Sequence, residues 1–138
     1  MDERRDVRPE ATFRIVGSAM KVHRALGPGL LESAYRACLV HQLRLDGFNA
    51  RTEVPIALTY EGLNIGAAYR ADVVVDDTVL IELKAVDHID PVHCVQLVTY
   101  LKLASIPIGL LINFNVRQLR YGIRRFLNPN LCREPSTP

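Results

Sequence analysis

The sequence lacks the features of a membrane or secreted protein. No apolar run approaches the roughly 20 residues that a membrane helix requires, and the charged first residues are not followed by the apolar core of a signal peptide. Cysteines are few: Cys38, Cys94 and Cys132 are widely spaced and form no CxxC pair. We interpret them as buried, reduced thiols of a cytoplasmic protein.

Strong charge and several enzyme signatures are missing as well. The net charge is only +2 at pH 7, which permits an anionic partner but does not require one. The four histidines and three cysteines show no zinc-ligand spacing. The "GPGLL" stretch lacks the lysine and the preceding strand of a phosphate-binding loop. Ser33 and Ser105 stand in no context that would activate a nucleophile.

The composition predicts one compact globular domain. Hydrophobic residues make up 49% of the 138 residues and charged residues 23%, an ordinary balance for a folded chain. We expect a flexible leader over residues 1–9, a single domain over 10–127 and a disordered tail over 128–138.

Periodicity and turn residues predict helices, then strands, then a helix between two further strands. Helices are expected over 10–26, from residue 30 to Gly47, and over 91–105; strands over 50–60, 63–75, 78–86 and 106–116; and either a short strand or a helix over 117–127. This order, α-α-β-β-β-α-β, predicts an α/β fold with a mixed sheet and helices packed on it.

The stretch "TVLIELKAV" is an apolar strand that carries two charges. Glu82 and Lys84 are two residues apart, so they share a face with Leu80 and Val86. Taken alone, the pair is explained as a surface ion pair worth about 0 to 1 kcal/mol. However, both faces of the strand are apolar, which indicates that helices cover both and that the charges need a partner or a function.

The preceding strand supplies another carboxylate. Asp72 precedes three valines, and the turn at 76–77 makes the two strands antiparallel neighbours. Asp72 is therefore expected near the level of Glu82. The alternative is a carboxylate at a strand end that meets solvent or neutralises Arg70.

The second helix directs a glutamate toward the same region. On a helical wheel Glu32 projects between Leu39 and Leu43, inside the apolar arc. The alternative is that this first-turn glutamate only complements the helix dipole.

The third helix contributes a glutamine. Gln96 falls in the middle of a stripe of Val92, Tyr100 and Leu103, beside Tyr100 at i+4. A lone buried glutamine is usually a satisfied core amide, so the two interpretations stay open.

These residues together predict a cleft that holds Glu32, Asp72, Glu82, Lys84 and Gln96. Two carboxylates about 4 Å apart repel by roughly 4 kcal/mol at an effective dielectric near 20, and one lysine does not offset three of them. A divalent cation does, and oxygen ligands favour Mg²⁺ or Mn²⁺. Such a site suits hydrolysis of a phosphodiester, in which Lys84 positions or stabilises the attacking hydroxide.

The same residues carry a resemblance to a known family. The motifs "GLLESAY" (Gly29, Glu32, Tyr35), "YRADVVV", "IELKA", "QLVTY" and "GLLINFN" resemble the GxxExxY protein family of the PD-(D/E)XK nuclease superfamily, from about Phe13 to Phe126. The resemblance implies a restriction-endonuclease-like fold with an αβββαβ core, here with an extra N-terminal helix.

The resemblance also implies roles for the charged residues. Asp72 matches the metal-binding aspartate of the superfamily. Glu82 and Lys84 match its (D/E)xK pair, as metal ligand and catalytic lysine. Glu32 matches the acidic residue of the first core helix, which assists the metal site. Gln96 and Tyr100 match the QxxxY element of RecB-like nucleases.

The hypothesis from the sequence is a Mg²⁺- or Mn²⁺-dependent nuclease that acts on DNA or RNA. The alternatives are a nucleic-acid-binding or regulatory module that does not cleave, and a homodimer or subunit of a larger complex, which the small net charge would suit. Near the C-terminus the arginines at 117, 120, 124 and 125 interleave with Tyr121 and Phe126. They form either a nucleic-acid surface or a solvated face.

Overall fold

The computed structural model describes residues 9–131. In this part of the chain the elements, in order, are α1 (Pro9–Leu26), α2 (Glu32–Leu45), β1 (Ala50–Tyr60), β2 (Leu63–Val75), β3 (Val79–Lys84), α3 (Pro91–Ala104), β4 (Ile108–Asn113), the 3₁₀ helix η1 (Leu119–Gly122) and β5 (Ile123–Leu127). The closing segment, expected as either a strand or a helix, contains a short helix followed by a strand.

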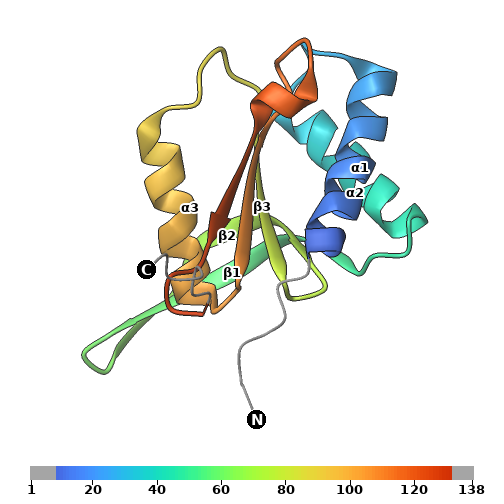
Figure 1. The fold of residues 1–138 in the computed structure, drawn as a ribbon. Helices are drawn as coiled ribbons and strands as arrows, with labels where there is room; N and C mark the ends of the chain where they lie inside the picture. The colour runs from blue at the N-terminus through green and yellow to red at the C-terminus, as the bar shows by residue number, and fades with distance from the viewer. Residues whose placement is uncertain (1–8, 132–138) are drawn as a thin grey trace, which may run out of the picture.

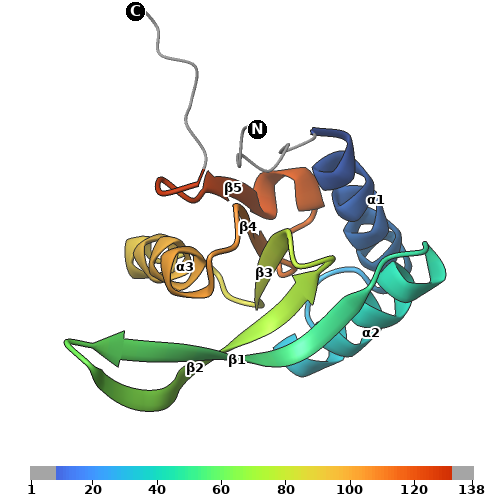
Figure 2. The same ribbon diagram turned by 90° about the horizontal axis from the view of Figure 1, so that it is seen from below.

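The five strands form one mixed sheet in the order β1-β2-β3-β4-β5. Neighbouring strands are antiparallel except β3 and β4, which are parallel and joined through α3. Helix α3 covers one face of the sheet, and α1 and α2 cover the other (Figures 1 and 2). The predicted fold class, a mixed sheet flanked by helices with an extra N-terminal helix, is confirmed.

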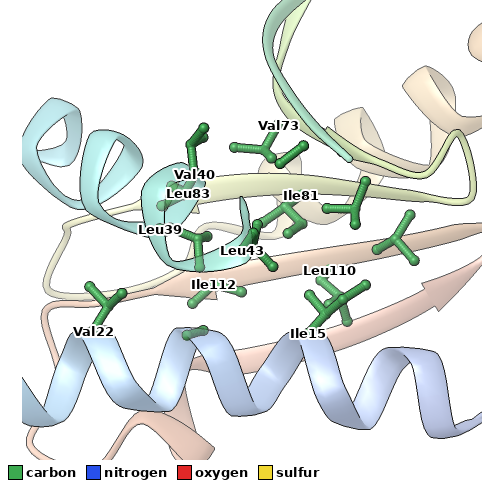
Figure 3. Close-up of a cluster of buried hydrophobic side chains, with 14 of the residues drawn as sticks. Ile15, Val22, Leu39, Val40, Leu43, Val73, Ile81, Leu83, Leu110 and Ile112 are labelled. Atoms are coloured by element: carbon green, nitrogen blue, oxygen red, sulfur yellow. The ribbon is translucent and has the colours of Figure 1, made fainter. Parts of the chain in front are cut away.

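The two central strands are buried on both faces. On the side of α1 and α2, Ile81 and Leu83 of β3 pack with Leu110 and Ile112 of β4 against the two helices (Figure 3). On the side of α3, Leu80 and Leu111 pack against Leu97 and Leu101. Each fully buried aliphatic side chain contributes about 1.5–3 kcal/mol to folding. Glu82 is only 5% exposed, so it is a charged side chain inside this apolar strand.

The turn between α1 and α2 is held by a buried tyrosine. The Tyr35 hydroxyl donates to the Gly27 carbonyl at 2.5 Å and accepts from the Leu30 amide at 3.1 Å. Its ring stacks on Phe114 with centroids 4.7 Å apart. Gly29 adopts a φ of 101°, a conformation that favours glycine. The Gly29 and Tyr35 positions of the GxxExxY motif therefore fix the direction from which α2 starts, with Glu32 as its first residue.

The cysteines differ from the expectation of buried thiols. Cys38 is exposed because it lies on the outer side of α2, and Cys94 is half-buried. Cys132 lies outside the described residues. Among the helices of residues 9–131, none has the length and hydropathy needed to cross a bilayer.

The chain ends of the predicted domain are described in part. The expected leader lies outside the described residues except for Pro9, which begins α1. The expected tail begins in ordered structure: Asn128 is 1% exposed, and its side-chain amide donates to the carbonyls of Leu101 and Ile106 at 2.8 and 3.1 Å. Residues 132–138 lie outside the described part.

Candidate active site

The candidate site lies where β2 and β3 separate. Their backbone pairing runs from Val75–Val79 to Val73–Ile81. At the next position, side-chain carboxylates replace the carbonyl oxygens as acceptors. The Asp72 amide donates to Glu82 Oε1 at 3.3 Å, and the Leu83 amide donates to Asp72 Oδ2 at 2.9 Å. Each carboxylate is therefore anchored to the backbone of the neighbouring strand. We call this pair of strand ends, with Asp72 and Glu82, the fork.

The backbone around Asp72 is irregular. Ala71 and Val74 both belong to the apolar cluster under α3, whereas Val73 belongs to the opposite cluster, so the strict alternation of β2 is interrupted at Asp72. In β1, Glu53 lies between the residues that pair with Val73 and Ala71 and adopts a φ of 51°. A left-handed non-glycine residue costs roughly 1–2 kcal/mol, and such strain is common near functional sites.

Glu82 is held by a tyrosine that the sequence analysis did not select. Its Oε2 accepts from the Tyr69 hydroxyl at 2.5 Å, and the Tyr69 ring stacks on Tyr100 with centroids 3.6 Å apart. Burial, followed by the negative charge of Asp72, raises the pKa of Glu82 to about 7. Burial, followed by its hydrogen bond to Glu82, also raises the pKa of Tyr69. The Glu82 carboxyl therefore holds its proton more tightly than an exposed glutamate does.

Glu32 faces the same charges from helix α2. Partial burial, followed by the charge of Asp72, raises the pKa of Glu32. The positive charges of Lys84, Arg36 and His93 act in the opposite direction. The sequence-predicted residues Glu32, Asp72, Glu82 and Lys84 therefore influence one another, from two strands and one helix.

A second residue that the sequence analysis missed is Arg36. Its guanidinium lies 3.6 Å from Asp72 Oδ1 and 3.6 Å from Glu53 Oε1. Arg36 follows Glu32 by four residues, so the two share a helix face. That spacing is the signal by which the sequence could have placed Arg36 beside the fork.

Lys84 ends β3 and is half-buried beside β4, where it pairs with Asn113. Asn113 is 3% exposed, and its side chain both donates to the Val86 carbonyl, at 2.8 Å, and accepts from the Val86 amide, at 3.1 Å. The Phe114 amide also donates to the Lys84 carbonyl at 2.9 Å. These bonds fix the end of β3 from which the Lys84 side chain extends.

The predicted inward stripe of α3 is wrong. Gln96 is exposed and Val92 is 49% exposed, whereas Leu97 and Leu101 are fully buried against the sheet. Apolar residues occur around most of this helix, so periodicity could not select the buried face. Tyr100 is half-buried and lies against Tyr69, so its contact with the fork runs through that ring. The Gln96 side chain makes no hydrogen bond to any described residue.

The carboxylates were tested for their fit to a divalent cation. Within residues 9–131 no group of three His, Cys, Asp or Glu side chains is arranged to enclose a metal ion. Magnesium, however, is commonly bound through one or two carboxylates, and water and phosphate oxygens complete its coordination. Asp72 and Glu82 supply such oxygens, and burial and the charge of Asp72 raise the pKa of Glu82. The pair fits Mg²⁺ or Mn²⁺ in this two-carboxylate form.

Comparison with known proteins places these residues in a family. A family model described as the PD-(D/E)XK nuclease superfamily matches residues 9–126. No curated protein and no solved structure matches the chain significantly. The match spans α1 through most of β5, including every predicted site residue; the finer resemblance to the GxxExxY family stays a prediction.

Proposed function

Since this chain belongs to the PD-(D/E)XK nuclease superfamily and has its restriction-endonuclease-like fold, we propose that it is a nuclease that hydrolyses phosphodiester bonds of DNA or RNA with Mg²⁺ or Mn²⁺. The observation that carries the proposal is the fork. Across the separating strands the Glu82 carboxylate accepts from the Asp72 amide and the Asp72 carboxylate accepts from the Leu83 amide, next to Glu32 and the Lys84 ammonium. A buried pair of carboxylates in this arrangement is expected to hold a cation or to give up charge.

Each residue then has a distinct task. Asp72 and Glu82 would hold the ion, and Glu32 would assist from α2. A bound divalent cation lowers the pKa of a water molecule and polarises the phosphate. The Lys84 ammonium, at the end of β3 two residues beyond Glu82, would position and stabilise the attacking water. Tyr69 keeps the Glu82 carboxylate oriented, and Tyr100 supports Tyr69 by stacking.

A nuclease assay tests the proposal directly. The protein is incubated with Mg²⁺ or Mn²⁺ and with single-stranded, double-stranded and structured DNA and RNA. Cleavage is expected for the native protein and should be lost in Asp72→Asn. The matched control is Asp87→Asn, since Asp87 is an exposed aspartate in the loop after β3. Cleavage that persists unchanged in Asp72→Asn would overturn the assignment.

One observation favours a second candidate, a nucleic-acid-binding module that does not cleave. The carboxylate oxygens of the fork already have protein partners: Leu83 and Arg36 for Asp72, and Tyr69 and the Asp72 amide for Glu82. Calorimetric titration with Mn²⁺ separates the two candidates. No metal binding at millimolar concentration, with nucleic acid still retained, would favour the module.

The remaining proposals concern the oligomeric state and the cellular location of the protein. Gel filtration tests whether it acts alone, as a homodimer or within a larger complex, which the net charge of +2 would suit. A cytoplasmic location stays a prediction from cysteine usage.

A further inference from the structure

Charge is unevenly distributed along the chain. Between residues 91 and 131 there are five basic residues and no aspartate or glutamate, whereas every acidic residue of the described part lies at or before Asp90. Helix α3, η1 and β5 therefore carry positive charge that no acidic residue of their own segment offsets. This separation within one small domain is a feature of polyanion-binding surfaces.

The basic residues near η1 are exposed, and one of them, Arg120, lies over an aromatic ring. Tyr121 is 72% exposed. The Arg120 guanidinium lies 4.7 Å from the centroid of the Tyr121 ring and is held by Gln118 Oε1 at 3.1 Å and by the Tyr121 hydroxyl at 2.9 Å. Together with Val116, Arg117 and Gln118, Tyr121 lines an open hollow of about 520 Å³. The ring is thus kept in one orientation although it faces solvent.

The arginines of this region differ from other basic residues of the described part in their partners. Among the described residues, none of Arg117, Arg120, Arg124 and Arg125 is paired with a carboxylate, whereas Arg36, Arg51 and Lys21 elsewhere are. Arg120 donates to Gln118 and Tyr121 instead, and Arg124 donates to Cys94 Sγ at 3.6 Å. No described carboxylate therefore competes with phosphate, which a guanidinium binds with two parallel hydrogen bonds.

The segment is fixed to the strand end that carries Lys84. A Cβ on Gly122 would lie 2.2 Å from the Asn113 carbonyl oxygen, so η1 rests directly on the end of β4. Asn113 in turn pairs with Lys84 and binds Val86. The His23 ring bonds to the Val116 carbonyl at 2.7 Å, which holds the loop before η1. Figure 1 shows η1 at the same end of the sheet as the loop that follows β3.

We propose that these side chains form a nucleic-acid platform for the unpaired part of the substrate. We call it the arginine–tyrosine platform, and it consists of Arg117, Arg120, Tyr121 and Arg125; the alternation of β5 directs Arg124 to the other face, toward Cys94 of α3. The arginines bind backbone phosphates, and Tyr121 stacks on an unpaired base. A duplex offers the same phosphates but keeps its base faces covered, so the exposed, oriented ring favours a single strand. The inference rests on the proposed nuclease function and names the form of its substrate.

The experiment measures binding without cleavage. Fluorescence anisotropy follows the binding of labelled single-stranded and blunt double-stranded oligonucleotides, with Ca²⁺ in place of Mg²⁺, over a range of salt concentrations. Tyr121→Ala is expected to weaken single-strand binding about 5- to 20-fold and to leave duplex binding within about twofold. The matched control is Tyr60→Ala, because Tyr60 is 70% exposed at the tip of the β1–β2 hairpin.

A second pair of variants tests the arginines. Arg117→Gln with Arg125→Gln is expected to weaken binding and to reduce the slope of log affinity against log salt by about 0.7 for each lost phosphate contact. Arg24→Gln with Arg51→Gln removes equal charge elsewhere and should have a smaller effect. Equal losses in both double variants, equal losses of single-strand and duplex binding in Tyr121→Ala, or no binding of either oligonucleotide would each overturn the platform. The last result would point to an acidic protein partner.

The outcomes also separate this inference from the proposed function. If platform variants lose single-strand binding but the native protein does not cleave with Mg²⁺, the platform stands and the nuclease assignment fails. If the native protein cleaves and the platform variants bind normally, the nuclease assignment stands and the platform fails.

Discussion

The fork and the arginine–tyrosine platform lie at one end of the same sheet but handle charge in opposite ways. In the fork, Glu82 is 5% exposed, and the carboxylate oxygens are engaged by backbone amides, Tyr69 and Arg36. In the platform the arginines are exposed and pair with no carboxylate of the described residues. The carboxylates of the fork are bonded within the protein, whereas the arginines of the platform have only uncharged partners among the described residues.

The difference teaches what each region can do. Two buried negative charges repel each other, so the fork is expected either to take up a proton or to bind a cation. The raised pKa of Glu82 reflects this repulsion together with burial. Exposed arginines can lie close together with little repulsion, because water and salt screen their charges over about 10 Å. Each arginine therefore binds a phosphate weakly. The contributions of the arginines to nucleic-acid affinity add up, and they decrease as the salt concentration rises.

The largest effect is expected from Lys84→Ala. Loss of the ammonium beside the fork should reduce Mg²⁺-dependent cleavage by about 10³-fold, since it stabilises charge that develops during the reaction. Single-strand affinity should stay within about twofold, because the platform is separate. The measurement is single-turnover cleavage beside anisotropy, with Lys102→Ala as the control on the exposed side of α3. A parallel loss of binding would mean that the two regions are one site.

The connection between the regions is tested by Gly122→Ala. A Cβ would come within 2.2 Å of a backbone oxygen, so we expect a loss of about 3 kcal/mol in the free energy of unfolding. Gly17→Ala is the control: nothing lies within 4 Å of that position in α1, and alanine should stabilise the helix by about 0.5–1 kcal/mol. Urea unfolding measures both. Equal stability of the two variants would show that η1 is not tightly seated on β4.

The fork should also give a pH dependence of stability. The pKa of Glu82 in the folded protein is about 7, above its ordinary value of 4.5, so the folded state binds the proton more tightly than the unfolded state. Protonation of Glu82 therefore stabilises the folded state fully below pH 4.5, and this stabilisation, about 3 kcal/mol, is lost as the pH rises through 7. Urea unfolding at pH 5 and pH 8 should show this decline, and Glu82→Gln should flatten it. An unchanged slope in that variant would contradict the assignment to Glu82.

A surface carboxylate elsewhere should behave in the opposite sense. Hydrogen bonds from Ser18 and Lys21 lower the pKa of Asp46 to about 2. Its stabilising effect is present above its ordinary pKa of 3.8 and is lost only as the pH falls toward 2. The Asp46→Asn variant should therefore leave the decline between pH 5 and pH 8 intact.

The smallest effect distinguishes the two stacked tyrosines. Tyr69→Phe removes the hydroxyl bonded to Glu82 and should weaken Mn²⁺ binding about tenfold, as is typical when a ligand loses its supporting hydrogen bond. Tyr100→Phe keeps the stacked ring and should change the affinity by less than twofold. Isothermal titration calorimetry provides the comparison. Equal losses in both variants would show that Tyr69 does not act through its hydroxyl.

The sequence predicted most of the fold because its turns are explicit. The strand limits 50–60 and 63–75 match β1 and β2, since the turn at 61–62 and the apolar runs leave little choice. Counting across the turn at 76–77 also placed Asp72 beside Glu82. Residues packed by the tertiary structure were harder to find: Asn128, for example, was assigned to a tail although it binds two carbonyls.

The parts of the site that were missed share a physical cause. Tyr69 is three residues before Asp72, and regular alternation would put the two on opposite faces of a strand. The irregularity at Asp72, opposite the left-handed Glu53, is set by long-range pairing and leaves no local signal. The predicted inward position of Gln96 was wrong for a different reason, because α3 is apolar on most of its surface and its buried face depends on the sheet below.

The central position of β3 also limits how the protein can be divided or engineered. The charged residues at the fork and beside it, from Glu32 to Lys84, all precede α3. A fragment that ends after β3 would nevertheless expose the edge of β3, which pairs with β4 along six residues. An apolar strand with such an open edge aggregates. The chain should therefore not be cut, and no sequence should be inserted, between β3 and β4. The tip of the β1–β2 hairpin, which projects from the body of the molecule (Figure 2), is the place where added sequence is best tolerated.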